Sequence, residues 1–320
     1  MNKSSMLRME WFIHTYIHTY IHTQPIRVLD VGSWRIDGHD CYKDLFRDIK
    51  TDYIGLDMSA GSNVDLVVEN PYKWDMLEND SFDVVISGQA FEHIEFPWLT
   101  MQEISRVLKP NGLCCIIAPN GNCRHRAPTD CWRFYEDGML ALARYVGFEP
   151  LHVSVNSAPA NAPEEWFSQW EDCILVAKKT NEMPEFSYLP KVYDLNELNS
   201  NFLSSLEYRL LRDKCKVYVW GAGKLGKDTA NYLEQKGIHI QGYLDSNEKL
   251  WQQSEKYVVL SPNDILQKVK DNNMHIIIST AVLDIFGKCL DAGLEPEKDF
   301  SVSACQSSST KAWLYSIQSP

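Results

Sequence analysis

The chain has 320 residues, of which 44% are hydrophobic and 12% aromatic, as in a globular protein long enough for two domains. Its 31 Lys and Arg against 43 Asp and Glu give a net charge of −12, without the basic excess that binding to nucleic-acid phosphates needs. No apolar run reaches the roughly 18 residues of a membrane span. The nine cysteines form no CxxC pair, which favours reduced thiols and a cytoplasmic location.

Residues 13–23 repeat the sequence Ile-His-Thr-Tyr twice and then continue Ile-His-Thr. On a helix His14, His18 and His22 would follow one another at i, i+4 spacing, at which two histidines can bind a metal ion. The repeat itself contains no carboxylate or cysteine to complete such a site. We therefore predict that residues 1–25 form a helix that packs against a sheet. No cluster of oxygen ligands stands out elsewhere, so no metal site is predicted.

The segment VLDVGSWRIDG (28–38) predicts a strand and a glycine turn that leads into a helix, and YIGLD (53–57) predicts a second strand. The carboxyl ends of such strands are where α/β sheets bind nucleotide-like ligands. Gly32 lets the backbone approach a ligand, and Asp57 is placed to accept hydrogen bonds from ribose hydroxyls. Because no GxGxxG follows the first strand, the pattern favours a nucleoside without a pyrophosphate.

The segment FDVVISGQAFEHIEF (82–96) indicates a buried strand that leads into a polar loop. WLTMQEISRVLKPNG (98–112) has apolar residues at helical spacing and ends in a helix-stop sequence. LCCIIAPNG (113–121) predicts a further strand. Strands and helices in alternation predict an α/β fold with a parallel sheet and crossover helices.

At this point the chain resembles the class I S-adenosylmethionine-dependent methyltransferases over about residues 26–179. The motifs that carry this resemblance are VLDVGS, YIGLD, FDVVISGQAFEH, RVLKPNG and CWRFYEDGM. The loop HRAPTDCWRFYEDGM (125–139) is similar to a group linked to polysaccharide and surface-glycan biosynthesis. The resemblance implies a Rossmann-like, mostly parallel seven-stranded sheet in a domain of residues 1–180.

The same resemblance implies that S-adenosylmethionine is the cofactor. The residues that it assigns to cofactor binding are Asp30, Gly32, Ser33, Asp57, Met58, Glu69, Asn70, Ser87 and Gly88. One position departs from the family pattern, because Trp34 stands where a second glycine is common. A bulky residue there would narrow the cofactor pocket, and an alternative reading is a scaffold with a degenerate site.

Methyl transfer to a hydroxyl needs a group that accepts the proton. Two loops at the carboxyl ends of the predicted strands supply candidates, and the predicted catalytic residues are Glu92, His93 and His125. The alternatives are that Glu92 caps a helix and that His93 packs at its start. The predicted acceptor-binding residues are Arg126, Asp130, Trp132 and Arg133. The arginines could bind phosphate or carboxylate or form ion pairs, and Trp132 and Phe134 could stack on a sugar or pack in the core.

A linker is predicted over residues 181–200 and a second domain over residues 201–320. The segment 216–247 reads as a strand, a glycine-rich turn, a helix and a strand. Its GAGKLG matches GxGxxG, and the fingerprint residues are Gly221, Gly223, Gly226 and, nineteen residues later, Asp245. The segment resembles small Rossmann-like modules of sugar-modifying enzymes. Its ligand is left open between a nucleotide, a nucleotide-sugar and NAD, and a structural or homo-oligomerising role is the alternative.

The function predicted from these features is methyl transfer to a hydroxyl of a sugar or glycan intermediate. The alternatives are a small-molecule or lipid methyltransferase, and an NAD- or nucleotide-sugar-binding protein with a degenerate methyltransferase domain. The position of Asn70-Pro71-Tyr72, before rather than after the strand that leads to SGQAFEH, argues against DNA or protein amide nitrogen as the acceptor.

Overall fold

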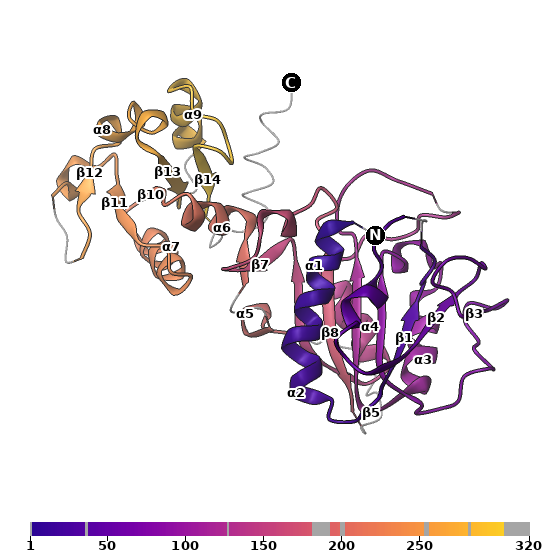
Figure 1. Cartoon of the computed structure of the whole chain (residues 1–320). Helices are drawn as coiled ribbons and strands as arrows, with labels where there is room; N and C mark the ends of the chain where they lie inside the picture. The colour runs from indigo at the N-terminus through magenta and orange to yellow at the C-terminus, as the bar shows by residue number, and fades with distance from the viewer. Residues whose placement is uncertain are drawn as a thin grey trace. The chain divides into compact units, whose positions relative to one another are not determined.

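The computed structural model describes residues 2–35, 38–126, 128–180, 193–198, 202–252, 256–280 and 283–303 (Figure 1). The chain divides into two compact units, Met1–Phe202 and Leu203–Pro320. Most of the predicted linker lies outside the described residues. The part within them forms the short helix α5 (Leu195–Leu198), which packs against the core of the first unit.

The first unit begins with a helix that contains the repeat. It consists of α1 (Lys3–Phe12), the π-helical turn η1 (Ile13–Ile17) and α2 (His18–Tyr20). The repeated isoleucines Ile13 and Ile17 are buried against the sheet, whereas the histidines that follow the isoleucines of the repeat are exposed. The π-helical turn interrupts the i, i+4 spacing on which a metal site in the repeat would depend. The repeat is therefore a packing face.

The first unit is built around a seven-stranded sheet. Its strands are β1 (Ile26–Val31), β2 (Thr51–Asp57), β3 (Leu66–Val67), β4 (Phe82–Gly88), β5 (Leu108–Ala118), β6 (Phe148–Val155) and β8 (Cys173–Lys179). The strand order is β3-β2-β1-β4-β5-β8-β6, and β8 alone runs antiparallel to its neighbours. The predicted mostly parallel seven-stranded sheet is thus confirmed.

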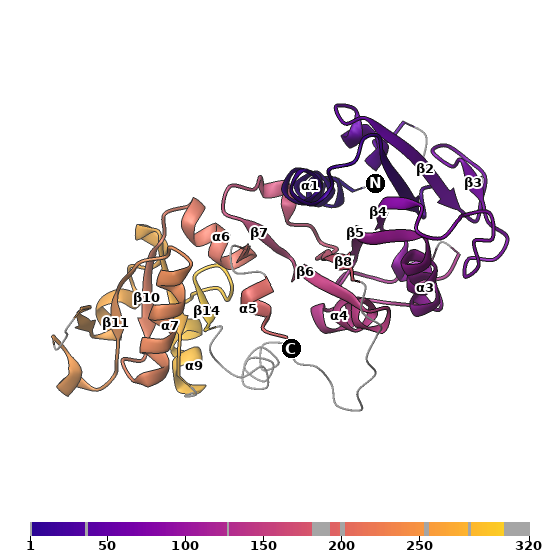
Figure 2. The same ribbon diagram turned by 90° about the horizontal axis from the view of Figure 1, so that it is seen from below.

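Helices cover both faces of this sheet, with α1 on one face and α3 (Pro97–Val107) and α4 (Glu136–Tyr145) on the other (Figure 2). Alternate residues of β1 face the two layers: Val28 packs with α1, and Leu29 packs with α3 and α4. The remaining elements of this unit are the 3₁₀ turns η2 (Tyr42–Phe46), η3 (Phe91–His93) and η4 (Glu164–Trp166), and the strand β7 (Ser157–Pro159).

The helix predicted directly after Gly32 is not found, and this expectation was wrong. Among the described residues between β1 and β2, the regular structure is η2, which starts ten residues later at Tyr42. The intervening Gly38 has φ +82°, a left-handed conformation that cannot continue a helix. The turn therefore presents its own backbone, and no helix N-terminus, toward the carboxyl edge of the sheet.

The second unit contains a five-stranded parallel sheet of order β12-β11-β10-β13-β14. Its strands are β10 (Lys216–Trp220), β11 (Ile240–Leu244), β12 (Val259–Leu260), β13 (Met274–Ile278) and β14 (Phe300–Val302). Its helices are α6 (Ser205–Arg212), α7 (Lys224–Gln235), α8 (Pro262–Leu266) and α9 (Leu283–Asp291), with 3₁₀ turns η5 (Glu248–Leu250) and η6 (Lys270–Asn272). The short strand β9 (Phe202–Ser204) lies at the boundary between the units.

Side chains of β10 alternate between two apolar layers. Val217 and Val219 pack with α6 and α7, whereas Tyr218 and Trp220 pack with α8 and α9. The strand–turn–helix–strand order predicted for residues 216–247 is therefore present. In the part of the chain that the structure describes, no helix is both long and apolar enough to cross a membrane.

Candidate active site

The glycine turn after β1 lies against the loop that follows β4. Gly32 has φ +79°, and a Cβ atom placed on it would lie 2.4 Å from the Cβ of Ala90. The backbone N–H groups of Gly32 and Ser33 donate to the carbonyl oxygen of Leu56, at 2.9 and 3.1 Å. Only glycine fits this position, and it brings the ends of β1, β2 and β4 together at the carboxyl edge of the sheet.

Asp57 lies at the end of β2, as predicted, and is partly exposed. Its carboxylate accepts hydrogen bonds from the backbone N–H of Trp34 at 3.1 Å and of Ser59 at 3.0 Å. The Trp34 side chain lies against the loop after β2, since a Cβ atom on Gly61 would lie 2.3 Å from its indole nitrogen. Trp34 is half exposed, so its indole packs on that loop and remains open to solvent.

Asp30 lies beneath the turn and supports it. Its buried carboxylate accepts hydrogen bonds from the Tyr53 hydroxyl at 2.6 Å and from the Asn63 amide at 3.3 Å. The Asn63 amide also donates to the Ser33 carbonyl at 3.0 Å. Burial raises the pKa of Asp30 to about 7. Asp30 therefore acts on the turn through Asn63.

The predicted cofactor residues of β4 are buried. The Ser87 hydroxyl donates to the Val31 carbonyl at 2.7 Å, which fastens β4 to β1. A Cβ atom on Gly88 would lie 1.8 Å from the Tyr42 hydroxyl, so glycine is required there. Ser87 and Gly88 therefore support the carboxyl edge of the sheet through contacts inside the protein.

The other predicted cofactor residues lie on the surface around this edge. Met58 is 59% exposed directly after Asp57, and Glu69 and Asn70 are exposed after β3. The Asn70 side chain accepts a hydrogen bond from the Tyr72 backbone N–H at 2.9 Å, which shapes a turn. All three positions therefore lie on the surface, after the ends of β2 and β3.

The three predicted catalytic residues come together although they lie on two separate loops. Glu92 and His93 belong to η3, and His125 belongs to the loop after β5. One side-chain oxygen or nitrogen atom of each lies within 4.8 Å of the others. The two imidazole rings are 4.9 Å apart between centroids, and His93 Nε2 is 3.7 Å from Glu92 Oε1.

The Glu92 carboxylate is fully buried, and neither oxygen has a hydrogen-bond partner among the described residues. Burial raises the pKa of this carboxyl to about 8. Neither of its oxygens caps a helix, so the capping alternative is not what the structure shows. A buried carboxylate without a partner is costly, which points to a ligand or a proton that it holds.

Backbone hydrogen bonds join η3 to the loop after β5. The N–H groups of Cys131 and Trp132 donate to the Glu92 carbonyl at 2.7 and 3.2 Å. His93 Nδ1 lies 2.5 Å from the Thr129 carbonyl oxygen, and the Thr129 hydroxyl donates to the His93 carbonyl at 2.7 Å. The two loops therefore form one connected structure around the three side chains.

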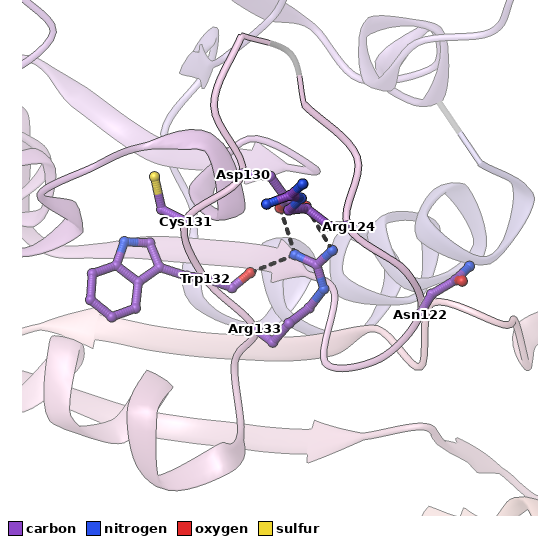
Figure 3. Close-up of a pocket in the computed structure, with 6 residues that line it drawn as sticks. All are labelled: Asn122, Arg124, Asp130, Cys131, Trp132 and Arg133. Atoms are coloured by element: carbon purple, nitrogen blue, oxygen red, sulfur yellow. Dashed lines mark hydrogen bonds and ion pairs between the residues drawn. The ribbon is translucent and has the colours of Figure 1, made fainter.

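Arg133 and Asp130 form an ion pair within this loop (Figure 3). The guanidinium donates to the two carboxylate oxygens of Asp130 at 2.6 and 3.0 Å. Its remaining N–H groups donate to the backbone carbonyls of Gly121, Cys123 and Trp132. The hydrogen bonds from Arg133 to Asp130, together with one from the His125 backbone N–H, lower the pKa of Asp130 to about 2. The ion-pair alternative for Arg133 is thus what the structure shows.

An open pocket lies over this ion pair, lined by Asn122, Arg124, Asp130, Cys131, Trp132 and Arg133 (Figure 3). The Trp132 indole points away from the guanidinium and donates to the Ile94 carbonyl at 3.0 Å. Arg126 is exposed. Phe134 is buried in the core beside Phe91, so the core-packing alternative holds for Phe134.

A row of aromatic side chains continues from Trp132, and most of it was not predicted from the sequence. Ring contacts link Trp132 to Trp98, Trp98 to Phe96 and Phe96 to Tyr72, with centroids 6.2, 5.7 and 5.6 Å apart. Trp132, Trp98 and Phe96 are each more than one third exposed. Phe96 and Trp98 flank Pro97 at the start of α3. In the sequence, two aromatic residues on either side of this proline were the feature from which the row could have been predicted.

A buried polar cluster beneath the site was also missed. The Gln89 amide donates to Asp172 at 2.9 Å, and the Ser4 hydroxyl donates to the other carboxylate oxygen of Asp172 at 2.9 Å. Arg8 Nη1 lies 4.0 Å from that second oxygen and donates to the Trp166 carbonyl at 2.6 Å. An arginine on the apolar face of α1 was the signal in the sequence.

In the second unit the fingerprint residues lie at the ends of β10 and β11. Gly221 has φ +116°, and a Cβ atom on Gly226 would lie 1.8 Å from the Gly221 carbonyl oxygen. Gly223 precedes α7, and the Asp245 carboxylate accepts from the backbone N–H of Ala222 at 3.0 Å. The turn is therefore tight, as the predicted pattern requires.

Comparison with known proteins gives a family match for part of the first unit. Residues 34–116 match the family model described as a methyltransferase domain. No curated protein matches the sequence.

Similar solved structures include a Haloferax volcanii complex of a Trm112 methyltransferase activator with a putative methyltransferase (18% identity, TM-score 0.39, covering 55% of this chain and 95% of that chain). Another is Burkholderia thailandensis 1,6-didemethyltoxoflavin-N1-methyltransferase with bound 1,6-didemethyltoxoflavin and S-adenosylhomocysteine (16% identity, TM-score 0.43, covering 56% of this chain and 80% of that chain). A third is a putative sarcosine dimethylglycine methyltransferase from Galdieria sulphuraria (15% identity, TM-score 0.40, covering 54% of this chain and 86% of that chain). Residues 34–116 of this chain are therefore similar in sequence to methyltransferase domains.

Proposed function

We propose that the first unit transfers a methyl group from S-adenosylmethionine to a hydroxyl of a sugar or glycan intermediate. The observation that carries the cofactor assignment is the tight Gly32 turn, which lies against Ala90 at the carboxyl edge of the sheet, with the Asp57 carboxylate bonded to the next turn residue but one, Trp34. These residues fit a nucleoside: a backbone that a ligand can approach, and an acceptor for ribose hydroxyls. When bound, the cofactor supplies an electrophilic methyl group on its sulfonium.

In this proposal Asp57 binds the ribose, and the turn at Gly32 and Ser33 borders the methionine part. Met58 and the exposed Glu69 and Asn70 surround the base. Asp30, Ser87 and Gly88 act from beneath by fixing the backbone. Preorganised positioning of this kind is a main source of rate enhancement when two reactants must be held in line.

Two features support a sugar acceptor. The aromatic row from Trp132 to Tyr72 begins next to the loop that carries His125, and aromatic rings pack well against the apolar face of a sugar ring. The second feature is the likeness of the loop 125–139 to that of glycan-modifying methyltransferases. A small-molecule or lipid acceptor would use the same edge of the sheet and is distinguished by assaying acceptors of each class.

The group that accepts the acceptor's proton is proposed to come from Glu92, His93 and His125. Ala90, which touches Gly32, precedes Glu92 by two residues, so these side chains border the proposed cofactor site. In this proposal the acceptor hydroxyl binds between the cofactor and these side chains.

Replacing Asp57 with alanine is expected to weaken binding of S-adenosylmethionine and S-adenosylhomocysteine at least about tenfold, because hydrogen bonds to a charged group contribute about 1.5–3 kcal/mol. Isothermal titration calorimetry of the full chain measures this. The matched control is Asp52→Ala, which removes an exposed carboxylate from the same strand. Asp57→Asn, which keeps the shape of the side chain and an acceptor for one of the two amides of Trp34 and Ser59, checks that the loss is not a loss of fold. Equal affinity in the wild type and both Asp57 variants would reject the ribose assignment.

We also propose that the second unit is a Rossmann-like module that binds a nucleotide, a nucleotide-sugar or NAD at the turn 221–226. The full chain titrated with NAD and with UDP-glucose is expected to bind one of them, and Gly226→Ala is expected to abolish that binding by displacing the Gly221 carbonyl. Gly287→Ala is the control, because nothing lies within 4 Å of the added methyl group. Binding that survives Gly226→Ala would place the ligand elsewhere, and no binding of either probe would favour the structural role.

A further inference from the structure

Glu92, His93 and His125 have the composition and geometry of a metal site, although the sequence predicted none. We propose that these three side chains bind a divalent first-row transition-metal ion. Their ligand atoms lie within 4.8 Å of one another, and they come from two loops that backbone hydrogen bonds hold together. Two imidazoles and one carboxylate are a recurrent ligand set for such ions and leave positions open for another molecule.

The carboxylate is the strongest indication that something else belongs in the site. Glu92 is fully buried, and both oxygens lack a hydrogen-bond partner among the described residues. Buried carboxylates are normally paired, hydrogen-bonded or bound to a metal. Among the described residues, the ionisable side-chain nitrogen nearest to its oxygens is Nε2 of His93, 3.7 Å from Oε1, and Arg133, which pairs with Asp130, acts on Glu92 only from a longer distance. A metal ion would supply the missing positive charge.

The orientation of His93 fits a metal ligand. Its Nδ1 lies 2.5 Å from the Thr129 carbonyl oxygen, which can only accept, so Nδ1 carries the proton. The lone pair is then on Nε2, the atom that lies 3.7 Å from Glu92 Oε1. Metal-binding histidines characteristically donate their other ring N–H to a carbonyl or a carboxylate in this way.

His125 is held by its surroundings. Its backbone N–H donates to Asp130 at 2.6 Å, and its ring packs against Trp170 at a centroid distance of 4.7 Å and against His93 at 4.9 Å. The ion pair of Asp130 with Arg133 fixes the loop on which His125 lies. Ligand atoms around one ion are typically separated by about 3–4 Å, so a small inward movement of the side chains would close the site.

Imidazole ligands favour transition metals over magnesium and calcium, which prefer sites made of oxygen atoms. If the proposed methyl transfer holds, an ion here would bind the acceptor oxygen and make its proton more acidic, so that solvent water could take up the proton that one of the three side chains accepts when no ion is bound. The binding of the ion itself does not depend on that function.

The test titrates Zn²⁺ into the full chain by calorimetry, with Co²⁺ absorption as a second readout. All proteins carry His14→Gln, His18→Gln and His22→Gln, which remove the exposed histidines of the repeat as a separate source of zinc binding. We expect one ion per chain, with affinity reduced at least about tenfold by Glu92→Gln and by His125→Gln. Glu95→Gln removes an exposed carboxylate three residues from Glu92 and is expected to leave the affinity unchanged.

Two results would overturn the metal site: no stoichiometric zinc binding, or zinc binding that neither Glu92→Gln nor His125→Gln weakens. Binding of Mg²⁺ with equal affinity would overturn the assignment to a transition metal. Should Glu92→Gln fail to fold, as judged by circular dichroism, His125→Gln decides the matter, because that side chain is one third exposed. S-adenosylhomocysteine binding, measured in the same proteins, reports separately on the proposed function.

Discussion

Replacing Arg8 with methionine is expected to lower the free energy of unfolding of the first unit by about 3–5 kcal/mol, the range for breaking a buried ion pair by removing one partner. Arg8 and Asp172 are both fully buried, with Nη1 and Oδ2 4.0 Å apart. Burial lowers the pKa of Arg8 to about 10, so the guanidinium is still charged at neutral pH. Methionine retains most of the apolar volume but leaves the carboxylate without a counter-charge. Urea-induced unfolding followed by circular dichroism measures the change.

The same helix provides a control for this effect. Lys3 pairs with Glu165 at 2.6 Å, but both side chains are at least half exposed. Lys3→Met is therefore expected to change stability by less than about 1 kcal/mol. The double variant Arg8→Met/Asp172→Asn is expected to recover part of the loss, since no unpaired charge remains. A cost for Arg8→Met as small as that for Lys3→Met would show that the buried pair does not hold α1 in place.

Asp30→Asn is expected to make the protein more stable than the wild type at pH 8 but not at pH 4. Burial raises the pKa of Asp30 from 3.8 to about 7, so the folded protein binds more protons than the unfolded chain between these values. Stability then falls as pH rises through this window, by up to about 4 kcal/mol, and is constant above it. The variant lacks this dependence, and its amide oxygen can still accept from Tyr53.

Urea-induced unfolding of the two proteins at intervals from pH 4 to pH 8 checks this result. The raised pKa of the buried Glu92 also makes the free energy of unfolding fall with rising pH, equally in both proteins. The quantity compared is therefore the difference in the free energy of unfolding between them. Asp52→Asn serves as a control, because that carboxylate is about half exposed. A difference between wild type and Asp30→Asn that does not vary with pH would mean that Asp30 titrates normally in the folded protein.

The sheets could be predicted from the sequence because burial on both faces leaves a continuous apolar run. FDVVISG became β4 with every residue buried, and KVYVW became β10 between two apolar layers. The connection after Gly32 was predicted as a helix and is instead an irregular segment followed by η2. Turn geometry there depends on contacts with Ala90 and Leu56, which are distant in the sequence.

The candidate residues of the site could be named from the sequence, but their arrangement could not. Glu92, His93 and His125 were chosen because they follow strand ends, and the structure places them together. Their mutual geometry depends on hydrogen bonds between the two loops, such as the one from His93 to Thr129. For the same reason the sequence left Arg133 open between binding an acceptor and pairing with Asp130.

The backbone hydrogen bonds from Cys131 and Trp132 to the Glu92 carbonyl have a consequence for redesign of these two loops. If the loop after β5 were replaced with a loop from another protein, the new loop would lack the hydrogen-bond partners in η3 with which it folds in its own protein. Exchanging residues 89–98 together with that loop would preserve the hydrogen bonds between the two segments. If the proposed methyl transfer holds, acceptor preference is then expected to change through paired exchanges of both segments rather than through single ones.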